Sequence, residues 1–510
     1  MKISNKIIYD QIQELSPVIN EIKKQKKKIV LCIGHFNVIH PGHLRFIEFA
    51  KKQGDYLVVA VQGESKIDVR VKDKFFNEEQ RAKGVASLEY VDKVFVFNKT
   101  ELKDIVGIIK PNIYVKGEEF SKKRNEIKEE VDLVEKNGGK IVFSSGDSNH
   151  FDTELLDEDL VDIQKKRRIL FKEALEKQDI TVQNLLDCCD QFSKKRILVI
   201  GDTIVDQYIA CDALGMSSEA PVLVVKELEH KKYIGGAGIV ARHVKALGAK
   251  CTFVSIIGQD TTGELVTREL SDDGIDTKLI VDLGRPTTLK KRYMVGSQKI
   301  LRVSRLKDVH IDQTTEEKIT SYIDSISDEL DGIVITDFGY GIITQNILSY
   351  ISKISKQKNI KLFGDVQSSS QIGNVLKFNG YYMLKPNEKE ARIALDDKYS
   401  GLEVLGTNLI NKTNSNNLVL TLAGHGFISF GKTDDEYFIR TQHFPALNPT
   451  PIDVMGAGDS MIAGLSVSSC SGASLMQASA ISAIIAGIVV SKMGNVPIKL
   501  EEVKSYIKSL

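Results

Sequence analysis

Apolar and polar positions alternate along this chain in blocks, and the blocks change character near residue 195. Before that point, residues 27–34 and 56–61 are apolar runs of strand length, and residues 44–53 between them follow a helical spacing. A strand, a helix and a second strand in this order predict a right-handed crossover in a parallel sheet. Ligands of such a sheet are expected at the carboxyl ends of its strands.

The pattern after residue 195 predicts a second α/β domain. Alternating stretches at residues 222–226, 289–293 and 299–303 favour short antiparallel strands. Other apolar runs alternate with helical segments and end in polar or glycine-containing turns; these runs are residues 196–202, 332–336, 361–364, 381–384 and 418–421. We therefore expect a sheet whose active site lies along one edge.

Residues 153–194 carry leucine and isoleucine at helical spacing among many charges, with a break near Asp179. We interpret them as a helical connector that docks the two domains or two subunits. The basic run at residues 165–168 is interpreted as a solvated helix face rather than a nucleic-acid site. The predicted organisation is a helical extension at residues 1–27, a first domain at 28–152, the connector at 153–194 and a second domain at 195–510.

Composition argues against several classes of partner. The chain has 69 Lys and Arg against 68 Asp and Glu, so no overall field favours nucleic acid or an anionic membrane. No apolar run approaches the roughly 20 residues of a membrane span, and residues 1–6 lack the features of a signal peptide. The six cysteines show no CxxC spacing, which argues against a disulfide framework or a zinc site. We expect a cytoplasmic homodimer without nucleic-acid or membrane partners.

The first candidate site follows the first apolar strand. His40, Gly42 and His43 stand where that strand gives way to the helix. Gly42 allows the backbone to approach a phosphate chain closely, and the two histidines can donate hydrogen bonds to charge on an α-phosphate. Histidines also occur at helix caps without a function, and zinc would need a third ligand that the spacing does not supply. The strand–helix–strand context favours the phosphate site.

The second candidate site is residues 453–459, which run into an apolar helical segment. Gly456, Ala457 and Gly458 leave backbone amides accessible at the predicted helix N-terminus, which favours a phosphate or a developing anion. Asp459 at this terminus can take a proton from a substrate hydroxyl. The simpler alternative is a glycine-rich turn that caps a core helix.

The first of these stretches resembles the HxGH nucleotidyltransferase superfamily, and within it the cytidylyltransferase-like branch. Residues 79–81 resemble that family's ER-containing helix start, and residues 111–117 its strand with a basic residue. The resemblance implies a Rossmann-like domain in which a sugar phosphate attacks the α-phosphate of a nucleoside triphosphate and pyrophosphate leaves. It implies catalysis by His40 and His43, and nucleotide or phosphate binding by Gly34, Phe36, Gly42, Arg70, Lys72, Arg81 and Lys116.

Two departures from this family bear on its activity. The chain has Asn37 where the family commonly has Asp, and residues 146–152 replace a Ser/Thr-rich signature that contacts the nucleotide in relatives. The choice between ATP and CTP therefore stays open. So does an alternative in which this domain is only a binding or regulatory module beside an active sugar kinase.

Three ordered motifs after residue 195 resemble those of PfkB-type, or ribokinase-like, carbohydrate kinases: Gly235-Gly236, Asn387-x-x-Glu390 and residues 453–459. The resemblance covers essentially the whole second domain and implies a ribokinase-like α/β fold with a small β lid. It also implies roles for individual residues: Asp459 as the base, Gly456, Ala457 and Gly458 as the anion hole, Asn387 and Glu390 as indirect Mg²⁺ organisers, Thr421, Gly424 and Gly426 beside ATP, and Asp206, Gly235 and Gly236 at the sugar.

Residues 201–208 and 218–222 resemble, more narrowly, the kinase half of the bifunctional heptose-phosphate kinase/adenylyltransferases. That family phosphorylates heptose 7-phosphate at O1 and, after a phosphatase acts, transfers AMP to the 1-phosphate. The resemblance implies Mg²⁺, ATP for the kinase, ATP or CTP for the transferase, and Arg302 and Arg305 as a clamp for the substrate's phosphate.

The expected function is therefore the bifunctional synthesis of a nucleotide-activated sugar, ADP-heptose in the narrowest interpretation. The domain order is the reverse of the usual fusion, and Ile239 stands where relatives have a sugar-binding Asn. Because an apolar side chain cannot make that hydrogen bond, the same two reactions on another sugar remain the alternative.

Overall fold

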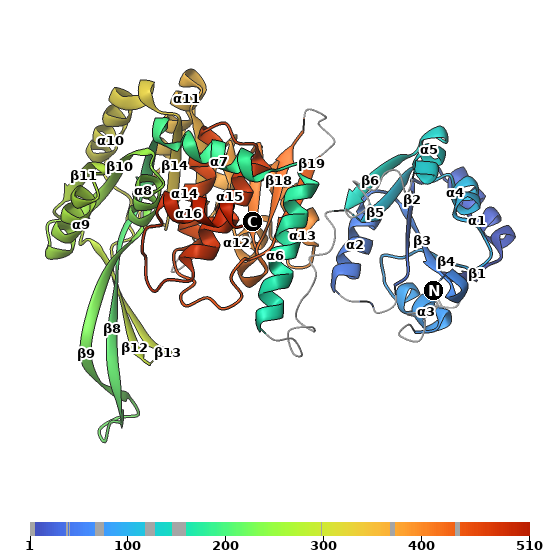
Figure 1. Cartoon of the computed structure of the whole chain (residues 1–510), viewed down its shortest axis with the longest axis horizontal. Coiled ribbons are helices and arrows are strands. Elements are labelled where there is room, and N and C mark those ends of the chain that lie inside the picture. The colour runs from blue at the N-terminus through green and yellow to red at the C-terminus, as the bar shows by residue number, and fades with distance from the viewer. Residues whose placement is uncertain are drawn as a thin grey trace. The chain divides into compact units, whose positions relative to one another are not determined.

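The structure is a computed structural model that describes residues 6–36, 39, 41–66, 76–117, 128–144, 160–296, 298–367, 373–433 and 439–510. The chain folds as two compact units (Figure 1). The first comprises Met1–Asp157 and Asp397–Leu405, and the second comprises Glu158–Asp396 and Gly406–Leu510. Both units contain a sheet covered by helices, which confirms the predicted α/β class.

The first unit is built on a six-stranded parallel sheet in the order β1-β4-β3-β2-β5-β6. Val30 and Cys32 on β2 face one hydrophobic cluster, and Ile29 and Leu31 face another. Helices cover both faces, which explains the continuous apolar strands. The strands are β1 (Ile7–Tyr9), β2 (Ile29–Gly34), β3 (Tyr56–Gln62), β4 (Lys93–Phe97), β5 (Ile113–Gly117) and β6 (Lys140–Ser144). The helices are α2 (Pro41–Lys52) and α3 (Glu78–Ala86) on the first face, and α1 (Ile12–Lys24), α4 (Leu102–Ile109) and α5 (Lys128–Lys136) on the second.

The N-terminal extension, predicted to be helical, is corrected in part. Residues 7–9 form edge strand β1, which pairs in parallel with β4. Helix α1 follows and buries Leu15, Ile19 and Ile22 on the sheet. A strand of three residues is too short to show an alternating pattern, so only the helix was visible in the sequence. The extension is thus part of the first unit's fold.

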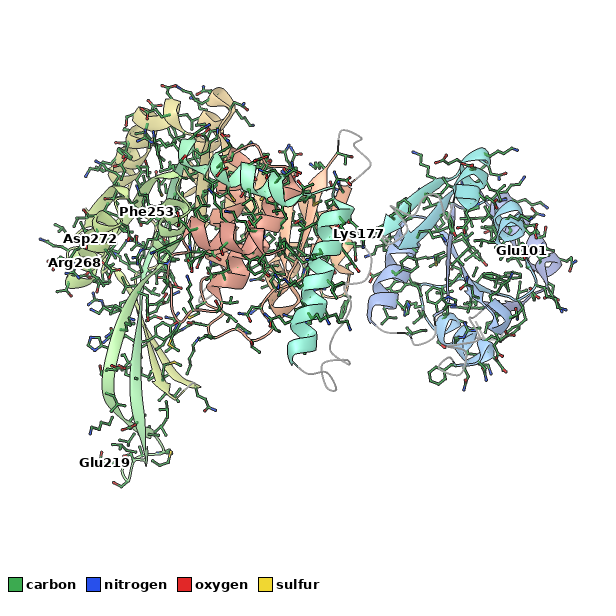
Figure 2. All side chains as sticks on the ribbon, in the orientation of Figure 1. Glu101, Lys177, Glu219, Phe253, Arg268 and Asp272 are labelled. Atoms are coloured by element: carbon green, nitrogen blue, oxygen red, sulfur yellow. The ribbon has the colours of Figure 1, made fainter. Side chains whose placement is uncertain are left out.

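The second unit is built on a nine-stranded sheet in the order β11-β10-β7-β14-β15-β16-β17-β18-β19. The strands from β11 to β17 run parallel, and β18 and β19 are antiparallel additions at one edge. Phe253 on β10 is fully buried, whereas Arg268 and Asp272 on α9 (Thr261–Asp272) are exposed (Figure 2). The strands are β7 (Arg196–Gly201), β10 (Lys250–Gly258), β11 (Asp276–Asp282), β14 (Gly332–Asp337), β15 (Lys361–Val366), β16 (Met383–Leu384), β17 (Asn417–Thr421), β18 (Phe427–Lys432) and β19 (Ile439–Phe444).

The core of the second unit lies between this sheet and a helical layer that includes α8 (Ala237–Ala246), α14 (Ala457–Cys470), α15 (Leu475–Val489) and α16 (Leu500–Lys508). Helix α14 is buried from Asp459 to Cys470, which explains why its sequence is apolar or small on every side. Elsewhere α10 (Gln313–Ile326) packs on α11 (Gln345–Lys358), and α11 contacts β15. The packing of α14 holds the start of this helix in a fixed place.

The predicted connector forms α6 (Leu160–Lys177) and α7 (Val182–Asp190), separated at the predicted break. Both helices pack on the second unit, because Phe171 on α6 and Leu185 on α7 are fully buried in its core. Within the basic run, Arg167 Nη1 donates a 3.1 Å hydrogen bond to the carbonyl of Ala446. The run therefore also anchors α6 to the second unit.

A separate four-stranded sheet, which we call the lid sheet, projects from the second unit in the order β13-β12-β8-β9 (Figure 1). The predicted antiparallel pairing of residues 289–293 with 299–303 is confirmed by the register of β12 and β13. Its strands are β8 (Thr203–Met216), β9 (Leu223–Gly236), β12 (Thr288–Val295) and β13 (Gln298–Arg305). Glu219 lies at the tip of the β8–β9 hairpin (Figure 2). Because β8 starts directly after β7, the base of the lid sheet lies at the carboxyl end of a central strand.

Within the described ranges, no helix has both the length and the apolar character needed to cross a membrane.

Candidate active sites

The carboxyl ends of the central strands in the second unit meet the base of the lid sheet around a cleft of about 360 Å³. Its wall contains the predicted site residues Asp206, Gly236, Asn387, Glu390, Thr421, Gly456, Gly458 and Asp459. It also contains Val454 and Met455 of the predicted stretch 453–459, and residues that were not predicted: Ile204, Lys290, Arg292, Phe338, Asp365, Gln367, Lys385 and Asn495. Motifs that lie far apart in the sequence thus share one cleft.

Asp459 lies in the first turn of α14, which begins at Ala457. Gly456 just before it has a φ of 77°, a left-handed conformation that favours glycine. Asp459 is 8% exposed, and Gln367 Nε2 donates a 2.6 Å hydrogen bond to its Oδ1. Burial, followed by the charge of Asp365, raises the pKa of Asp459 to about 7. A carboxyl group with this pKa can accept and return a proton near neutral pH.

Lys385 supplies a buried cation beside the start of α14. Its Nζ lies 3.1 Å from Oδ1 of Asp365, near the end of β15. A Cβ atom at Gly458 would lie 3.2 Å from the same Nζ, so the ammonium group reaches the helix start. Burial alone would lower the pKa of Lys385, but the charges of Asp365 and Glu390 outweigh this effect and raise it. The positive charge therefore stands beside the amides of a helix N-terminus, where an anion is favoured.

Lys385, Asp365 and Gln367 were not predicted as site residues, although a signal for two of them existed. Asp365 and Lys385 each follow an apolar run in the sequence. The ends of neighbouring parallel strands share one edge of a sheet, so this pattern could have placed both residues near the site. Gln367 lies in the loop after β15, and no motif marks it.

Asp206 on β8 occupies the lid side of the cleft. Arg292 Nη1 forms an ion pair with Asp206 Oδ1, and Asn495 Nδ2 donates a 3.0 Å hydrogen bond to Asp206 Oδ2. A Cβ atom at Gly235 would lie 2.4 Å from Asp206 Oδ2, so a larger residue there would have to displace the Asp206 carboxylate. Gly236 has a φ of 59° and joins β9 to α8. The predicted Gly-Gly motif thus makes room for the Asp206 side chain.

Neither arginine of the predicted phosphate clamp belongs to the cleft wall. Arg302 and Arg305 lie on β13, and Arg305 Nη2 is 2.6 Å from Oδ2 of Asp260, the N-cap of α9. Lys290 and Arg292 on β12 line the cleft instead. In the lid sheet β12 lies next to β8, whereas β13 lies one strand further out. The sequence predicted a basic hairpin near the substrate, but it did not show which of the two strands lines the cleft.

Asn387 and Glu390 form a capping box at the start of α12 (Glu388–Leu395). Asn387 Oδ1 accepts a 2.8 Å hydrogen bond from the backbone N–H of Glu390, and Glu390 Oε2 accepts a 2.9 Å hydrogen bond from that of Asn387. Both residues also line the cleft, so they can hold Mg²⁺ through its water ligands. No cluster of three or more His, Cys, Asp or Glu side chains suited to a metal occurs in the part of the chain that the structure describes.

The residues predicted beside ATP lie at the end of β17 and in the turn after it. Thr421 lines the cleft, and its backbone N–H donates a 3.0 Å hydrogen bond to the carbonyl of Pro386. Gly424 lies in the 3₁₀ turn after the strand. Gly426 has a φ of 89°, and a Cβ atom there would lie 2.0 Å from the carbonyl oxygen of Phe444. Glycine at position 426 is therefore required by close backbone packing.

In the first unit, the predicted site is described in part. Gly34 ends β2, Gly42 lies in the first turn of α2, and the ring of Phe36 is 5.2 Å from that of His43, measured between centroids. His43 therefore lies beyond the carboxyl end of a central strand, as predicted. Other predicted elements of the site lie outside the described residues: His40, Arg70, Lys72, Asn37 and the segment 146–152.

The other two predicted phosphate-binding cations of the first unit, Arg81 and Lys116, have partners within the protein. Arg81 is 2% exposed, and its Nη1 donates 2.7 Å hydrogen bonds to the carbonyls of His35 and Gln62. It therefore joins α3 to the ends of β2 and β3. Lys116 Nζ lies 2.9 Å from Glu130 Oε2 on α5. An anionic ligand at Lys116 would have to compete with this carboxylate.

Residues 194–501 match the model of the pfkB family of carbohydrate kinases, and residues 31–181 match the cytidylyltransferase-like model. The chain is 31% identical over 322 residues to "Bifunctional protein HldE" of a Nitratiruptor species, and the aligned region covers 62% of this chain and 66% of that protein. It is 33% identical over 320 residues to the protein of the same name from Campylobacter jejuni subsp. jejuni serotype O:6, covering 61% and 65%. The chain thus spans slightly less than two thirds of these curated relatives.

Solved structures with the same fold include phosphofructokinase-2 from Escherichia coli, in complex with substrates and products, and ribokinase from Giardia lamblia. The TM-scores are 0.52 and 0.51, at 15% and 17% identity. Each covers 62% of this chain and 99% of the solved chain. At these identities the likeness concerns the fold, and it confirms the predicted ribokinase-like architecture. Because the family model covers more than half of the sequence, the chain belongs to the pfkB family of carbohydrate kinases, with a cytidylyltransferase-like domain on its N-terminal side.

Proposed function

We propose that the chain is a bifunctional enzyme that makes a nucleotide-activated sugar. The second unit transfers the γ-phosphoryl group of ATP to O1 of heptose 7-phosphate, and the first transfers a nucleotidyl group to heptose 1-phosphate, giving ADP-heptose. The two matched family models and the similarity to proteins named HldE support this pairing. The observation that carries the kinase half is Asp459, a buried carboxyl group with a pKa of about 7 at a helix N-terminus.

In the proposed phosphoryl transfer, Asp459 accepts the proton of the sugar hydroxyl while the hydroxyl oxygen attacks the γ-phosphorus of ATP. A new O–P bond forms, the bond to the β–γ bridging oxygen breaks, and ADP leaves with that electron pair. The amides of residues 456–458 and the ammonium group of Lys385 stabilise the charge on the transferring group. When bound, Mg²⁺ held near Asn387 and Glu390 would neutralise further phosphate charge.

The cations at the base of the lid sheet support a phosphorylated sugar as the substrate. Lys290 is 4% exposed, with its Nζ 5.5 Å from the ring centre of Phe338 and 5.3 Å from that of Tyr340. Arg292 beside it is held by Asp206. An ammonium and a guanidinium group at one wall can bind the phosphate that the sugar already carries. In the proposal they take the role predicted for the two arginines of β13.

In the proposed nucleotidyl transfer, an oxygen of the sugar 1-phosphate attacks the α-phosphorus of the nucleoside triphosphate, and pyrophosphate leaves. His43 supports this half because it lies at the start of α2, beyond the end of β2. There its ring can donate a hydrogen bond to the α-phosphate as charge develops. Lys116 lies on β5, the strand next to β2, and can supply positive charge on release from Glu130.

The test uses the purified full chain with Mg²⁺ in two assays: ATP with heptose 7-phosphate, and ATP or CTP with heptose 1-phosphate. We expect the 1,7-bisphosphate in the first and pyrophosphate in the second. His43→Ala should abolish pyrophosphate release and spare phosphorylation, and Asp459→Asn should do the reverse.

Each other outcome points to a different conclusion. Phosphorylation without pyrophosphate from either nucleotide would mean that the first unit is a binding or regulatory module. Turnover of a different sugar phosphate would reassign the sugar. If neither product forms from any sugar phosphate, the proposed function is wrong.

A further inference from the structure

We propose that Asn495 binds the sugar hydroxyl next to the one that is phosphorylated, and so selects the sugar. The inference rests on the proposed kinase function of the second unit. Asn495 lies in the turn after α15, lines the cleft and is only 4% exposed. A buried amide at the wall of a substrate cleft is suited to reading a polar group of the substrate.

The orientation of the Asn495 amide is set by Asp206. Its Nδ2 donates a 3.0 Å hydrogen bond to Asp206 Oδ2. Reversing the amide would bring its oxygen against a carboxylate oxygen, and two acceptors cannot bond without a proton between them. Oδ1 therefore lies on the other side, toward Gly456, where a Cβ atom would be 2.9 Å from it.

Oδ1 of Asn495 is buried and has no hydrogen-bond partner among the residues that the structure describes. Buried acceptors are normally paired, and one left unpaired is costly. Both oxygens of the neighbouring Asp206 are engaged, one by Arg292 and the other by Asn495 itself. The group that completes this wall must bring its own proton, and a sugar hydroxyl does so.

The place of Oδ1 indicates which hydroxyl it binds. The Asn495 amide lies between Asp206, on the lid side, and Gly456, directly before α14, and Oδ1 is on the Gly456 side. Asp459, which accepts the proton of the attacking hydroxyl in the proposed reaction, is in the first turn of the same helix. A hydroxyl on the adjacent carbon is thus the one that Oδ1 meets. In heptose 7-phosphate that accepts a phosphoryl group at O1, this is the 2-hydroxyl.

The test compares heptose 7-phosphate with its 2-deoxy analogue in the full-length wild type and in Asn495→Ala. In the wild type, loss of the 2-hydroxyl should lower kcat/KM by about tenfold to a hundredfold. Asn495→Ala should lower kcat/KM for the parent sugar by a similar factor and make the two sugars equivalent, with the KM for ATP unchanged. Asn495→Ser, which keeps a small acceptor, should restore part of the discrimination.

Asn417→Ala is the matched control. Asn417 is also buried, and its Nδ2 donates a 3.0 Å hydrogen bond to the carbonyl of Tyr382, but it starts β17 while the cleft lies at the other end of that strand. This variant should keep the full preference for the parent sugar. If Asn495→Ala and Asn495→Ser both discriminate as strongly as the wild type, the inference is wrong.

Calorimetric binding of the same two sugars separates this inference from the kinase proposal. If the wild type binds the parent sugar more tightly than the 2-deoxy analogue and Asn495→Ala abolishes this difference, the inference is supported even if no phosphorylation occurs. In that case only the kinase function is refuted. If the wild type binds neither sugar and phosphorylates neither sugar, both proposals are wrong.

Discussion

Asp459→Asn should abolish phosphorylation and, at the same time, stabilise the second unit above neutral pH. Burial, followed by the charge of Asp365, raises the pKa of this carboxyl group from its ordinary 3.8 to about 7. The native state therefore holds the proton more tightly than the unfolded state does. The stability that this provides is present below about pH 4 and is lost as the pH rises to about 7.

The structure gives the magnitude of the effect. A tenfold change in an ionisation constant corresponds to about 1.4 kcal/mol, so a pKa raised from 3.8 to about 7 corresponds to about 4 kcal/mol. Asn has nearly the same shape without the charge, and its oxygen can still accept the hydrogen bond from Gln367. Above neutral pH the variant should gain up to this amount in its free energy of unfolding. Below about pH 4 the gain should vanish.

Urea unfolding, followed by circular dichroism because the chain has no Trp, measures this difference at about pH 4, 6 and 8. Asp260→Asn is a control of opposite sign. Burial would raise the pKa of Asp260, but hydrogen bonds from Gly263 and Thr287 and the charge of Arg305 lower it. Relative to the wild type, this variant should be less stable from about pH 4 to pH 8, and the deficit should shrink only as the pH falls below about 4. An Asp459→Asn difference that is independent of pH, or destabilising above neutrality, would refute the reasoning about the buried carboxyl group.

The remaining predictions concern the kinase reaction. Since only ionised Asp459 can accept the proton, kcat/KM for the sugar should rise with pH through about 7, and Asp365→Asn should move that rise to lower pH; a pH-independent rate would exclude Asp459 as the base. Lys385→Met should lower kcat about 10²- to 10³-fold. The single variant leaves one buried carboxylate unpaired, so if it fails to fold, kcat is measured in the double variant with Asp365→Asn. Gly235→Ala should displace Asp206 and lower kcat/KM for the sugar roughly 100-fold, with the KM for ATP unchanged; equal losses for both substrates would indicate a general folding defect.

The sequence by itself determined the elements and the two motif-bearing helix starts. Apolar runs of strand length became β2, β3, β14 and β15, because burial on both faces of a parallel sheet requires continuous apolar strands. The places of Asp459 and His43 at helix starts were predicted for a related reason, since a helix start after a strand is a pattern within a short stretch of sequence. In both cases the information lies within a few residues of the feature.

The tertiary structure alone decided which side chains meet. Gln367 and Asn495 carry no motif, and they reach the cleft only because the sheet order places their loops beside Asp459 and Asp206. Strand order likewise put Arg292 rather than its cross-strand partner Arg302 at the cleft, because β12 lies next to β8 and β13 lies one strand further out. The pKa of Asp459 depends on burial by segments distant in the sequence, and α6 joined the second unit through contacts that helical spacing cannot reveal. Periodicity records which face of an element is buried, whereas the partner on that face is set by long-range packing.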